Sequence, residues 1–118
     1  MVEQAWYNTL MGNQYIVFFF GSVRNFIEAL PDDDQGKING VVTAIESGDF
    51  KSLYIKTLKS PIKELIIKKY RLIFFVHKNT FYFIGAFVKK TAKTPKIEIE
   101  NAEKIFKKIM EIINNKRI

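Results

Sequence analysis

The residues in this sequence that are best suited to chemistry are its cations. Between Lys51 and Lys96 the chain holds 12 lysines and arginines and one acid, Glu64. This concentration of positive charge is typical of a surface that binds nucleic-acid phosphates. Arginine and lysine side chains can also align a reacting phosphate and stabilise the charge that develops on it. The pattern favours a nucleic-acid ligand, and the alternative is a solvated basic surface that aids solubility.

The charge is distributed unevenly along the chain, whose formal net charge is +7. Residues 1–50 hold two basic and seven acidic residues, whereas residues 51–118 hold 17 basic and five acidic ones. The second half of the chain is therefore where a polyanion is expected to bind.

Other common kinds of site lack their side chains here. The chain has no cysteine, which excludes a disulfide, a thiolate metal site and a cysteine nucleophile. His77 is the only histidine, and no serine or aspartate lies in a recognisable nucleophile motif. The run Asp32, Asp33 and Asp34 lacks further oxygen ligands at a recognised spacing and is interpreted as a capped turn. We therefore expect neither a metal nor another cofactor.

Length and composition predict one domain. The 118 residues, 47% of them hydrophobic and 26% charged, suit a single globular core over residues 1–118, with residues 1–13 as a loose N-terminal extension. The most apolar run, residues 15–20, is far shorter than the roughly 20 residues that cross a bilayer. It also lacks the upstream basic residues of a signal peptide. We expect a cytoplasmic protein that does not bind membranes.

The elements that must position the cations follow from apolar periodicity and turn residues. Residues 15–20 are predicted to form a buried strand. Ser22 is expected to cap a helix that ends at Pro31, and the three aspartates to begin a second helix that stops at Gly48. Strands are predicted over residues 62–68, 70–77 and 81–88. The last two are expected in the middle of a sheet that helices cover on one face.

A final helix is expected after Thr94 as its N-cap, with Pro95 at the first helical position. Its apolar stripe is predicted to pack on the sheet, or to dock on a partner, and consists of Ala102, Ile105, Phe106, Ile109, Met110 and Ile113. The predicted order of elements is β-α-α-β-β-β-α, an α+β fold.

The second half of the chain resembles a known family. Residues 87–95, Phe-Val-Lys-Lys-Thr-Ala-Lys-Thr-Pro, followed by Glu98 and Ala102, resemble the signature of the HigB-like (phage Gp49-like) toxins of the RelE superfamily. The resemblance covers roughly residues 15–115 and is strongest from Lys56 to Ala102. Further matches upstream are Lys56, Leu58 and Lys59, the pair Glu64-Leu65, and the pair Tyr70-Arg71.

The resemblance implies a RelE-like fold, a small and mostly antiparallel sheet with helices packed on it. It also implies the toxin of a type II toxin–antitoxin system, which cleaves messenger RNA at the ribosomal A site without a metal or cofactor. In that reaction the 2′-hydroxyl of the substrate attacks the adjacent phosphate. The implied partner is an antitoxin of the helix-turn-helix, HigA-like kind, and operator DNA is bound only through the complex of the two.

Three residues are the candidate catalytic groups. Arg71 matches the family's arginine and is expected to clamp the scissile phosphate, because its planar fork suits two phosphate oxygens; the alternative is a surface strand arginine. Lys90, in the loop after the last strand, is expected to act beside it. Lys56 could bind phosphate or, if neighbouring cations lowered its pKa, transfer a proton, and the sequence does not choose between Lys56 and Lys59 for these roles.

Four further residues are candidates for RNA binding. Lys59, Lys89 and Lys93 are expected to contact phosphates, with a solvated role as the alternative. Tyr70 could stack on a base or be an ordinary half-buried strand tyrosine. Glu64 is interpreted as the internal counter-ion of the basic stretch rather than a general base.

Two departures from the family pattern leave other functions open. Ile66 stands where members usually have an arginine, and Gly85 and Ala86 stand where many have a histidine or another polar residue. Loss of a guanidinium would weaken cleavage. The rival hypotheses are a ParE-like toxin that inhibits DNA gyrase and a nucleic-acid-binding module without catalysis.

Overall fold

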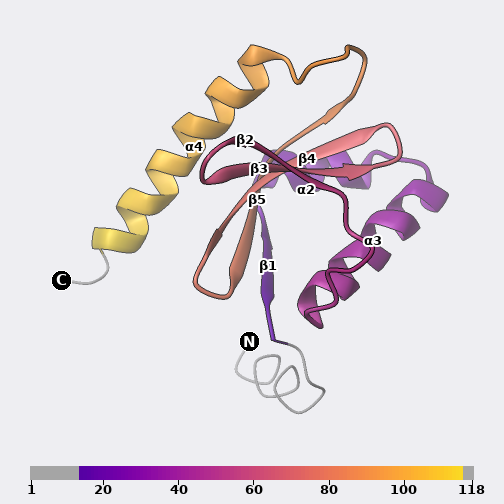
Figure 1. The fold of residues 1–118 in the computed structure, drawn as a ribbon, viewed down its shortest axis with the longest axis horizontal. Coiled ribbons are helices and arrows are strands. Elements are labelled where there is room, and N and C mark those ends of the chain that lie inside the picture. The colour runs from indigo at the N-terminus through magenta and orange to yellow at the C-terminus, as the bar shows by residue number, and fades with distance from the viewer. Residues whose placement is uncertain (1–13, 116–118) are drawn as a thin grey trace.

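A five-stranded sheet carries the helices α2, α3 and α4 in the computed structural model, which describes residues 14–115 (Figure 1). In chain order the elements are β1 (Ile16–Phe19), α2 (Gly21–Glu28), α3 (Asp32–Glu46), β2 (Ile55–Lys59), β3 (Ile62–Ile67), β4 (Tyr70–His77), β5 (Thr80–Val88) and α4 (Lys96–Asn115). The expected α+β fold and its order of elements are confirmed, with β2 added. The expected loose extension over residues 1–13 lies outside the described residues.

The sheet is mostly antiparallel, and its strands lie in the order β1-β5-β4-β3-β2. Strands β2 to β5 form an antiparallel meander, and β1 pairs with β5 in parallel. The two most apolar strands, β4 and β5, lie inside the sheet, as predicted. The side chains of β2 are largely exposed because it is an edge strand, so its sequence carries no apolar alternation that would have predicted it.

Helices cover both faces of the sheet, which corrects the expectation that they cover one. Helices α2 and α3 pack on one face against Leu72, Phe74, Phe81 and Phe83, and we call this the α3 face. Helix α4 packs on the other, the α4 face, against Ile73, Phe75, Ile84 and Phe87. Figure 1 shows the sheet between α4 and α3. Strands buried on both faces read as continuous apolar runs, which explains the sequences of β4 and β5.

The first strand is an edge strand rather than the buried strand that was expected. Strand β1 has β5 on one side, and alternate residues, Ile16 and Phe18, are about half exposed. Val17 and Phe19 point the other way and pack on the core of the α3 face. The run from 15 to 20 is apolar throughout, so its sequence did not reveal which face is open.

Two predicted helix caps are wrong. Helix α2 begins at Gly21, before Ser22, and its N-cap residue Phe20 provides no side-chain hydrogen bond. Helix α4 begins at Lys96, and the hydroxyl of Thr94 binds a carboxylate in the sheet instead of the helix end. The aspartates do occupy the first turn of α3, and Gly48 follows its end with a φ of 78°, as predicted.

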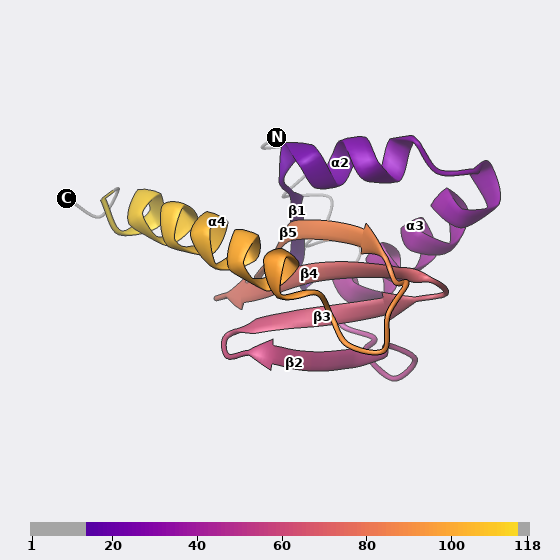
Figure 2. The same cartoon turned by 90° about the horizontal axis from the view of Figure 1, so that it is seen from above.

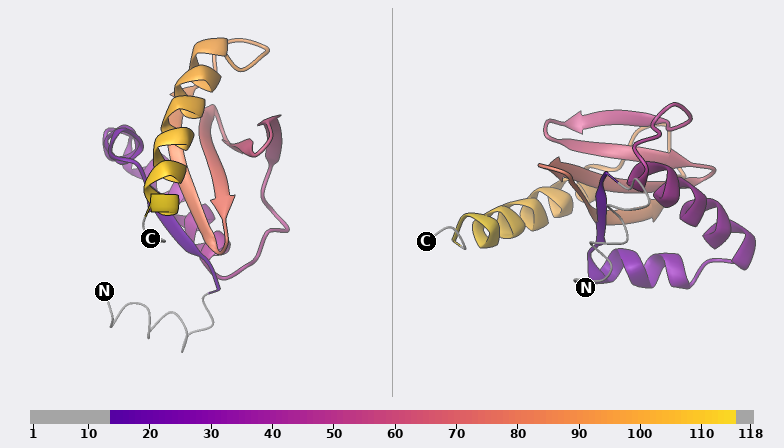
Figure 3. Two further views of the ribbon diagram at one scale, coloured as in Figure 1. Left: turned by 90° about the vertical axis from the view of Figure 1, so that its left-hand side faces the viewer. Right: turned by 90° about the horizontal axis from the view of Figure 1, so that it is seen from below.

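Helix α4 packs on the α4 face of the sheet from Ala102 to Met110. Figures 2 and 3 show its C-terminal turns extending past the strands. Ile112, near that end, is exposed, whereas Ala102 is buried against the sheet. No helix within residues 14–115 is both long and apolar enough to span a membrane.

Two glycines of α3 and its end should respond to alanine with opposite signs. Gly48→Ala should lower the free energy of unfolding by about 1 kcal/mol or more, because its φ is left-handed and a Cβ would lie 3.0 Å from Oε1 of Gln14. Gly40→Ala should raise the free energy of unfolding by up to about 1 kcal/mol. Gly40 lies in the interior of helix α3, where alanine is favoured over glycine, and a Cβ there would contact no other atom. Urea denaturation of the two variants measures both values. Equal shifts of the same sign would contradict this description of the helix end.

Candidate functional site

Arg71 is the second residue of β4, which follows the two-residue turn formed by Lys68 and Lys69. Its neighbours across the sheet are Ile66 on β3 and Phe87 on β5. Leu72 belongs to the core of the α3 face, so alternation along the strand places the Arg71 side chain on the α4 face. That side chain is 15% exposed. The guanidinium therefore sits in the surface of the sheet with only part of it open to solvent.

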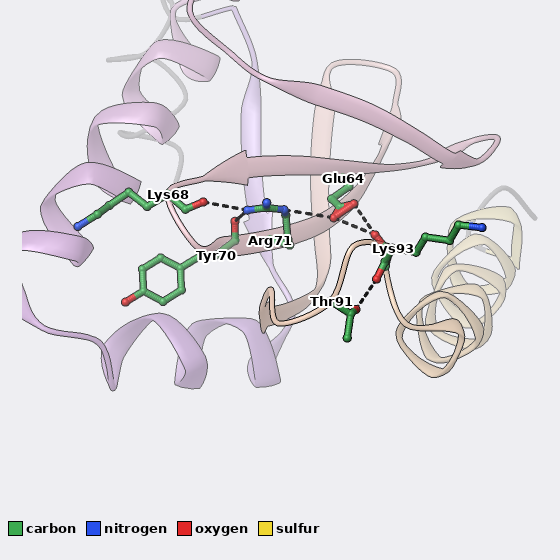
Figure 4. A network of polar contacts seen from close by, with 7 residues as sticks. Glu64, Lys68, Tyr70, Arg71, Thr91 and Lys93 are labelled. Atoms are coloured by element: carbon green, nitrogen blue, oxygen red, sulfur yellow. Dashed lines mark hydrogen bonds and ion pairs between the residues drawn. The ribbon is translucent and has the colours of Figure 1, made fainter.

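The guanidinium of Arg71 is held from two sides (Figure 4). Its Nη1 donates hydrogen bonds to the main-chain carbonyls of Lys68 and Tyr70, each at 2.9 Å. Its buried Nε lies 3.6 Å from Oε1 of Glu64, an ion pair too long for a hydrogen bond. Among residues 14–115, Nη2 makes no hydrogen bond, and it is not among the buried unpaired atoms. Two of the five N–H groups therefore remain to bind another molecule.

Glu64 is a fully buried carboxylate on β3. The hydroxyl of Thr94 donates to it, at 3.0 Å from Oε1 and 2.7 Å from Oε2. Together with the ion pair to Arg71, these contacts support its interpretation as the internal counter-ion of the basic stretch. They also tie the loop before α4 to the middle of the sheet.

The loop between β5 and α4, residues 89–95, runs beside Arg71. The Lys89 N–H donates to the Lys69 carbonyl at 2.8 Å, and the Thr91 hydroxyl donates to the Lys93 carbonyl at 2.6 Å. With Thr94 bound to Glu64, the loop is fixed at both ends. The side chains of Lys90 and Lys93 are exposed and that of Lys89 is half-buried, so the loop presents cations to solvent. The Lys93 side chain extends toward α4, away from the Arg71 guanidinium (Figure 4).

The two lysines of β2 occupy different environments. Lys56 is exposed and lies opposite Glu64 in the register of β2 and β3. Lys59 lies opposite Ile62, four residues along β3 from Ile66, or about 13 Å from the Arg71 end. Lys59 forms an ion pair with Glu103 at 2.9 Å, and this hydrogen bond raises the pKa of Lys59. The Lys59 ammonium is thus held by Glu103, whereas no ion pair holds Lys56 among the described residues.

Tyr70 lies on the other face from Arg71, which removes it from the candidate RNA-binding residues. Its ring is 2% exposed and packs at right angles to Phe26 on α2. Figure 4 shows the ring pointing away from the guanidinium. Adjacent residues of a strand point to opposite faces, so Tyr70 and Arg71 cannot serve one site with their side chains. That rule was available from the sequence alone.

The Tyr70 hydroxyl belongs to a second polar cluster, centred on Asp34 in the first turn of α3. The Asp34 carboxylate accepts hydrogen bonds from the Tyr70 hydroxyl and from Nζ of Lys68, the latter at 2.6 Å. The hydrogen bond from Lys68, and then that from Tyr70, lower the pKa of Asp34. The same hydrogen bond, with burial, raises the pKa of Tyr70. The cluster is therefore a stable ionised carboxylate with a neutral phenol.

An exposed tyrosine that the sequence analysis missed lies near Arg71. The Tyr54 carbonyl accepts a hydrogen bond from the Ile66 N–H at 2.9 Å, which places Tyr54 beside Ile66 and two strands from Arg71. Tyr54 is 72% exposed, so its ring can stack on an unpaired base. Recognising β2 as a strand would have been the signal that places Tyr54 at this edge.

Of the residues that depart from the family pattern, Ile66 and Gly85 lie on the α4 face with Arg71, whereas Ala86 packs on the core of the α3 face. Ile66 is half-buried and directly opposite Arg71. Gly85 lies opposite Ile73, and a Cβ at Gly85 would come within 3.4 Å of the Ile73 side chain. A Cβ at position 85 would therefore be in ordinary van der Waals contact with Ile73. Neither Ile66 nor Gly85 has a side-chain hydrogen-bond donor, so Arg71 supplies the guanidinium at this end of β3 and β4.

Taken together, these residues form a basic surface around one oriented guanidinium. Its members are Arg71, Lys56, Lys89, Lys90 and Lys93, contributed by β4, β2 and the loop 89–95. Their donors can bind a phosphate, and Arg71 can contribute charge to a phosphate that is reacting. No group of three or more histidine, aspartate or glutamate side chains within residues 14–115 is arranged to hold a metal ion.

Comparison with known proteins shows which family the chain belongs to. No curated protein matches the chain. A family model described as phage-derived Gp49-like protein matches residues 25–107, which include Glu64, Arg71 and the loop 89–95. This family is a toxin-like module of the RelE/HigB type. Because the match spans more than half of the chain, the protein belongs to the phage-derived Gp49-like family.

Proposed function

We propose that the protein is the toxin of a type II toxin–antitoxin system and that it cleaves messenger RNA on the ribosome. The observation that carries the proposal is the Arg71 guanidinium, oriented by two carbonyls and Glu64 while Nη2 remains open. A fixed guanidinium can donate charge-assisted hydrogen bonds to a phosphate without being reorganised first. Membership of a toxin-like family supports the proposal at a coarse level.

The proposed reaction uses the substrate's own nucleophile. A 2′-hydroxyl attacks the adjacent phosphorus, the bond from phosphorus to the 5′ oxygen breaks, and the products are a 2′,3′-cyclic phosphate and a 5′-hydroxyl. The proton of the 2′-hydroxyl must leave and the 5′ oxygen must gain one. Arg71 stabilises the charge on the phosphate, while Lys90 and Lys56 bind phosphate oxygens or move these protons. Lys89 and Lys93 hold the flanking backbone.

A second candidate is a nucleic-acid-binding module without catalysis. It is favoured by Ile66, which offers no donor where the family usually has an arginine, and by the two carbonyls that occupy Nη1 of Arg71. The basic surface would serve either function, so cleavage itself has to be measured.

The proposed partner is an antitoxin of the helix-turn-helix, HigA-like kind, through which the complex would bind operator DNA. Family membership motivates this, and the end of α4 beyond the sheet, with Ile112 exposed, offers a surface for it. Co-expression with the product of the neighbouring gene should give a stable complex and relieve growth arrest. Two proteins that purify separately, with arrest unrelieved, would refute the partnership.

Replacing Arg71 should reduce cleavage much more than binding. Arg71→Ala removes a contact that strengthens in the transition state, so the single-turnover rate on a ribosome-bound message should fall about a hundredfold or more. Arg71→Lys should restore little of it, because an ammonium group lacks the planar fork. Wild-type rates in Arg71→Ala would remove Arg71 from the mechanism.

The control for this experiment is stability, because Glu64 is buried. Removing its cation leaves a buried carboxylate unpaired, which typically costs about 3–5 kcal/mol. Arg71→Ala should therefore be combined with Glu64→Gln, and thermal unfolding should be followed for both. Glu64→Gln alone is the comparator, and a folded double variant that is much less active than Glu64→Gln attributes the loss to the guanidinium rather than to unfolding or to the change at Glu64.

Restoring the family's arginine should raise activity. Ile66 and Arg71 are direct cross-strand neighbours, so Ile66→Arg places a second guanidinium beside the first. One further charge-assisted contact to the phosphate should raise the cleavage rate about tenfold. Ile66→Gln, which is polar and uncharged but shorter than arginine, is the control for polarity alone. If both variants behave alike, position 66 does not reach the substrate.

A further inference from the structure

Asp34 binds the side chains of Lys68 and Tyr70, and the main-chain carbonyls of these two residues bind Arg71. The Asp34 carboxylate is nearly buried, 8% exposed, and binds the Lys68 ammonium and the Tyr70 hydroxyl. The carbonyls of these same two residues, Lys68 and Tyr70, accept the hydrogen bonds from Nη1 of Arg71. One carboxylate on the α3 face therefore fixes both main-chain acceptors of a guanidinium on the α4 face.

The turn formed by Lys68 and Lys69 could adopt more than one backbone conformation, so a contact outside the turn is needed to select one. Lys68 has a φ of 55°, in the left-handed region, which costs a residue with a Cβ roughly 1–2 kcal/mol. A two-residue turn can adopt several types, and each directs its carbonyls differently. The ion pair of Lys68 with Asp34, at 2.6 Å, offsets the cost of this particular one. The Lys68 carbonyl is thereby aimed at Arg71.

We propose that Asp34 is a positioning residue that orients the Arg71 guanidinium through the backbone of residues 68–70. Its effect on cleavage rests on the proposed function, whereas its effect on the guanidinium does not. Asp34 lies on the α3 face, so it acts without touching the substrate. Asp34 lies on α3 and fixes the backbone of residues 68–70. That backbone in turn orients Arg71 on the α4 face of the sheet.

A simpler role for Asp34 is that of a negative charge at the start of α3. Asp32 and Asp33 occupy the same first turn and would share it, because all three complement the helix dipole. Asp33 is exposed and has no hydrogen bond to the 68–70 segment, whereas Asp34 binds both of its outer residues. Asp33→Asn is therefore the matched control, since it removes the same charge from the same turn.

The first measurement reads the guanidinium directly. In a proton–nitrogen NMR spectrum of the arginine side chains, the Arg71 signals, assigned by their loss in Arg71→Lys, should exchange slowly with water in the wild type. Asp34→Asn should accelerate their exchange at least tenfold, and Asp33→Asn should leave it within twofold. Lys68→Met, which keeps the Tyr70 contact, should accelerate it as well and serves if Asp34→Asn does not fold.

The second measurement is cleavage of a ribosome-bound message. Asp34→Asn should lower kcat about tenfold with KM changed less than twofold, because the phosphate is still bound but its charge is less well stabilised. Asp34→Glu should recover part of the rate. If the Arg71 signals and kcat survive in both Asp34→Asn and Lys68→Met, or if Asp33→Asn is equally harmful, the positioning role is wrong. A wild type that does not cleave refutes the proposed function alone, since the NMR exchange rates still decide the positioning role.

Discussion

The rest of the site depends on one buried charge, the carboxylate of Glu64. A carboxylate without exposure to water must find a cation and hydrogen-bond donors inside the protein, because leaving it unpaired would cost several kcal/mol. Here Arg71 supplies the cation and Thr94 the hydroxyl. The two come from different elements, so satisfying Glu64 brings strand β4 and the loop 89–95 to one place. The orientation of the guanidinium and the course of the basic loop follow from that requirement.

Strands and helices with a clear pattern of apolar residues could be predicted from the sequence. The strand without such a pattern, β2, could not. Strands β4 and β5 are apolar throughout and were located almost to the residue, and the aspartates and Gly48 marked the ends of α3. Strand β2 escaped because an edge strand whose side chains face water has no alternation of apolar residues. The sequence also did not predict that helices cover both faces of the sheet. An apolar strand shows that it is buried, but it does not show which helix covers which face.

The candidate site divides in the same way. The match to a family pattern located Arg71, Glu64 and the loop lysines along the chain, and the fold pairs Arg71 with Glu64 and attaches the loop to Glu64 through Thr94. It could not say that Lys59 is bound to Glu103, because that contact joins β2 to a helix more than 40 residues later. Tyr70 was misplaced for a local reason, since in a strand the neighbour of a site residue faces away. The link from Asp34 through residues 68–70 is visible only in three dimensions, because it crosses the sheet.

The parallel pairing of β1 with β5 has a consequence for the order in which the molecule assembles. Residue 16 lies opposite residue 80, so β1 cannot pair with the sheet until β5 has been synthesised. The meander of β2 to β5 closes through short turns, whereas the β1 pairing must close a loop of some 60 residues and is entropically the costlier step. On a ribosome the sheet therefore cannot be completed until most of the chain has emerged. A nascent fragment that ends before β5 has neither the partner of β1 nor the loop that carries Lys90, and so cannot form the basic surface prematurely.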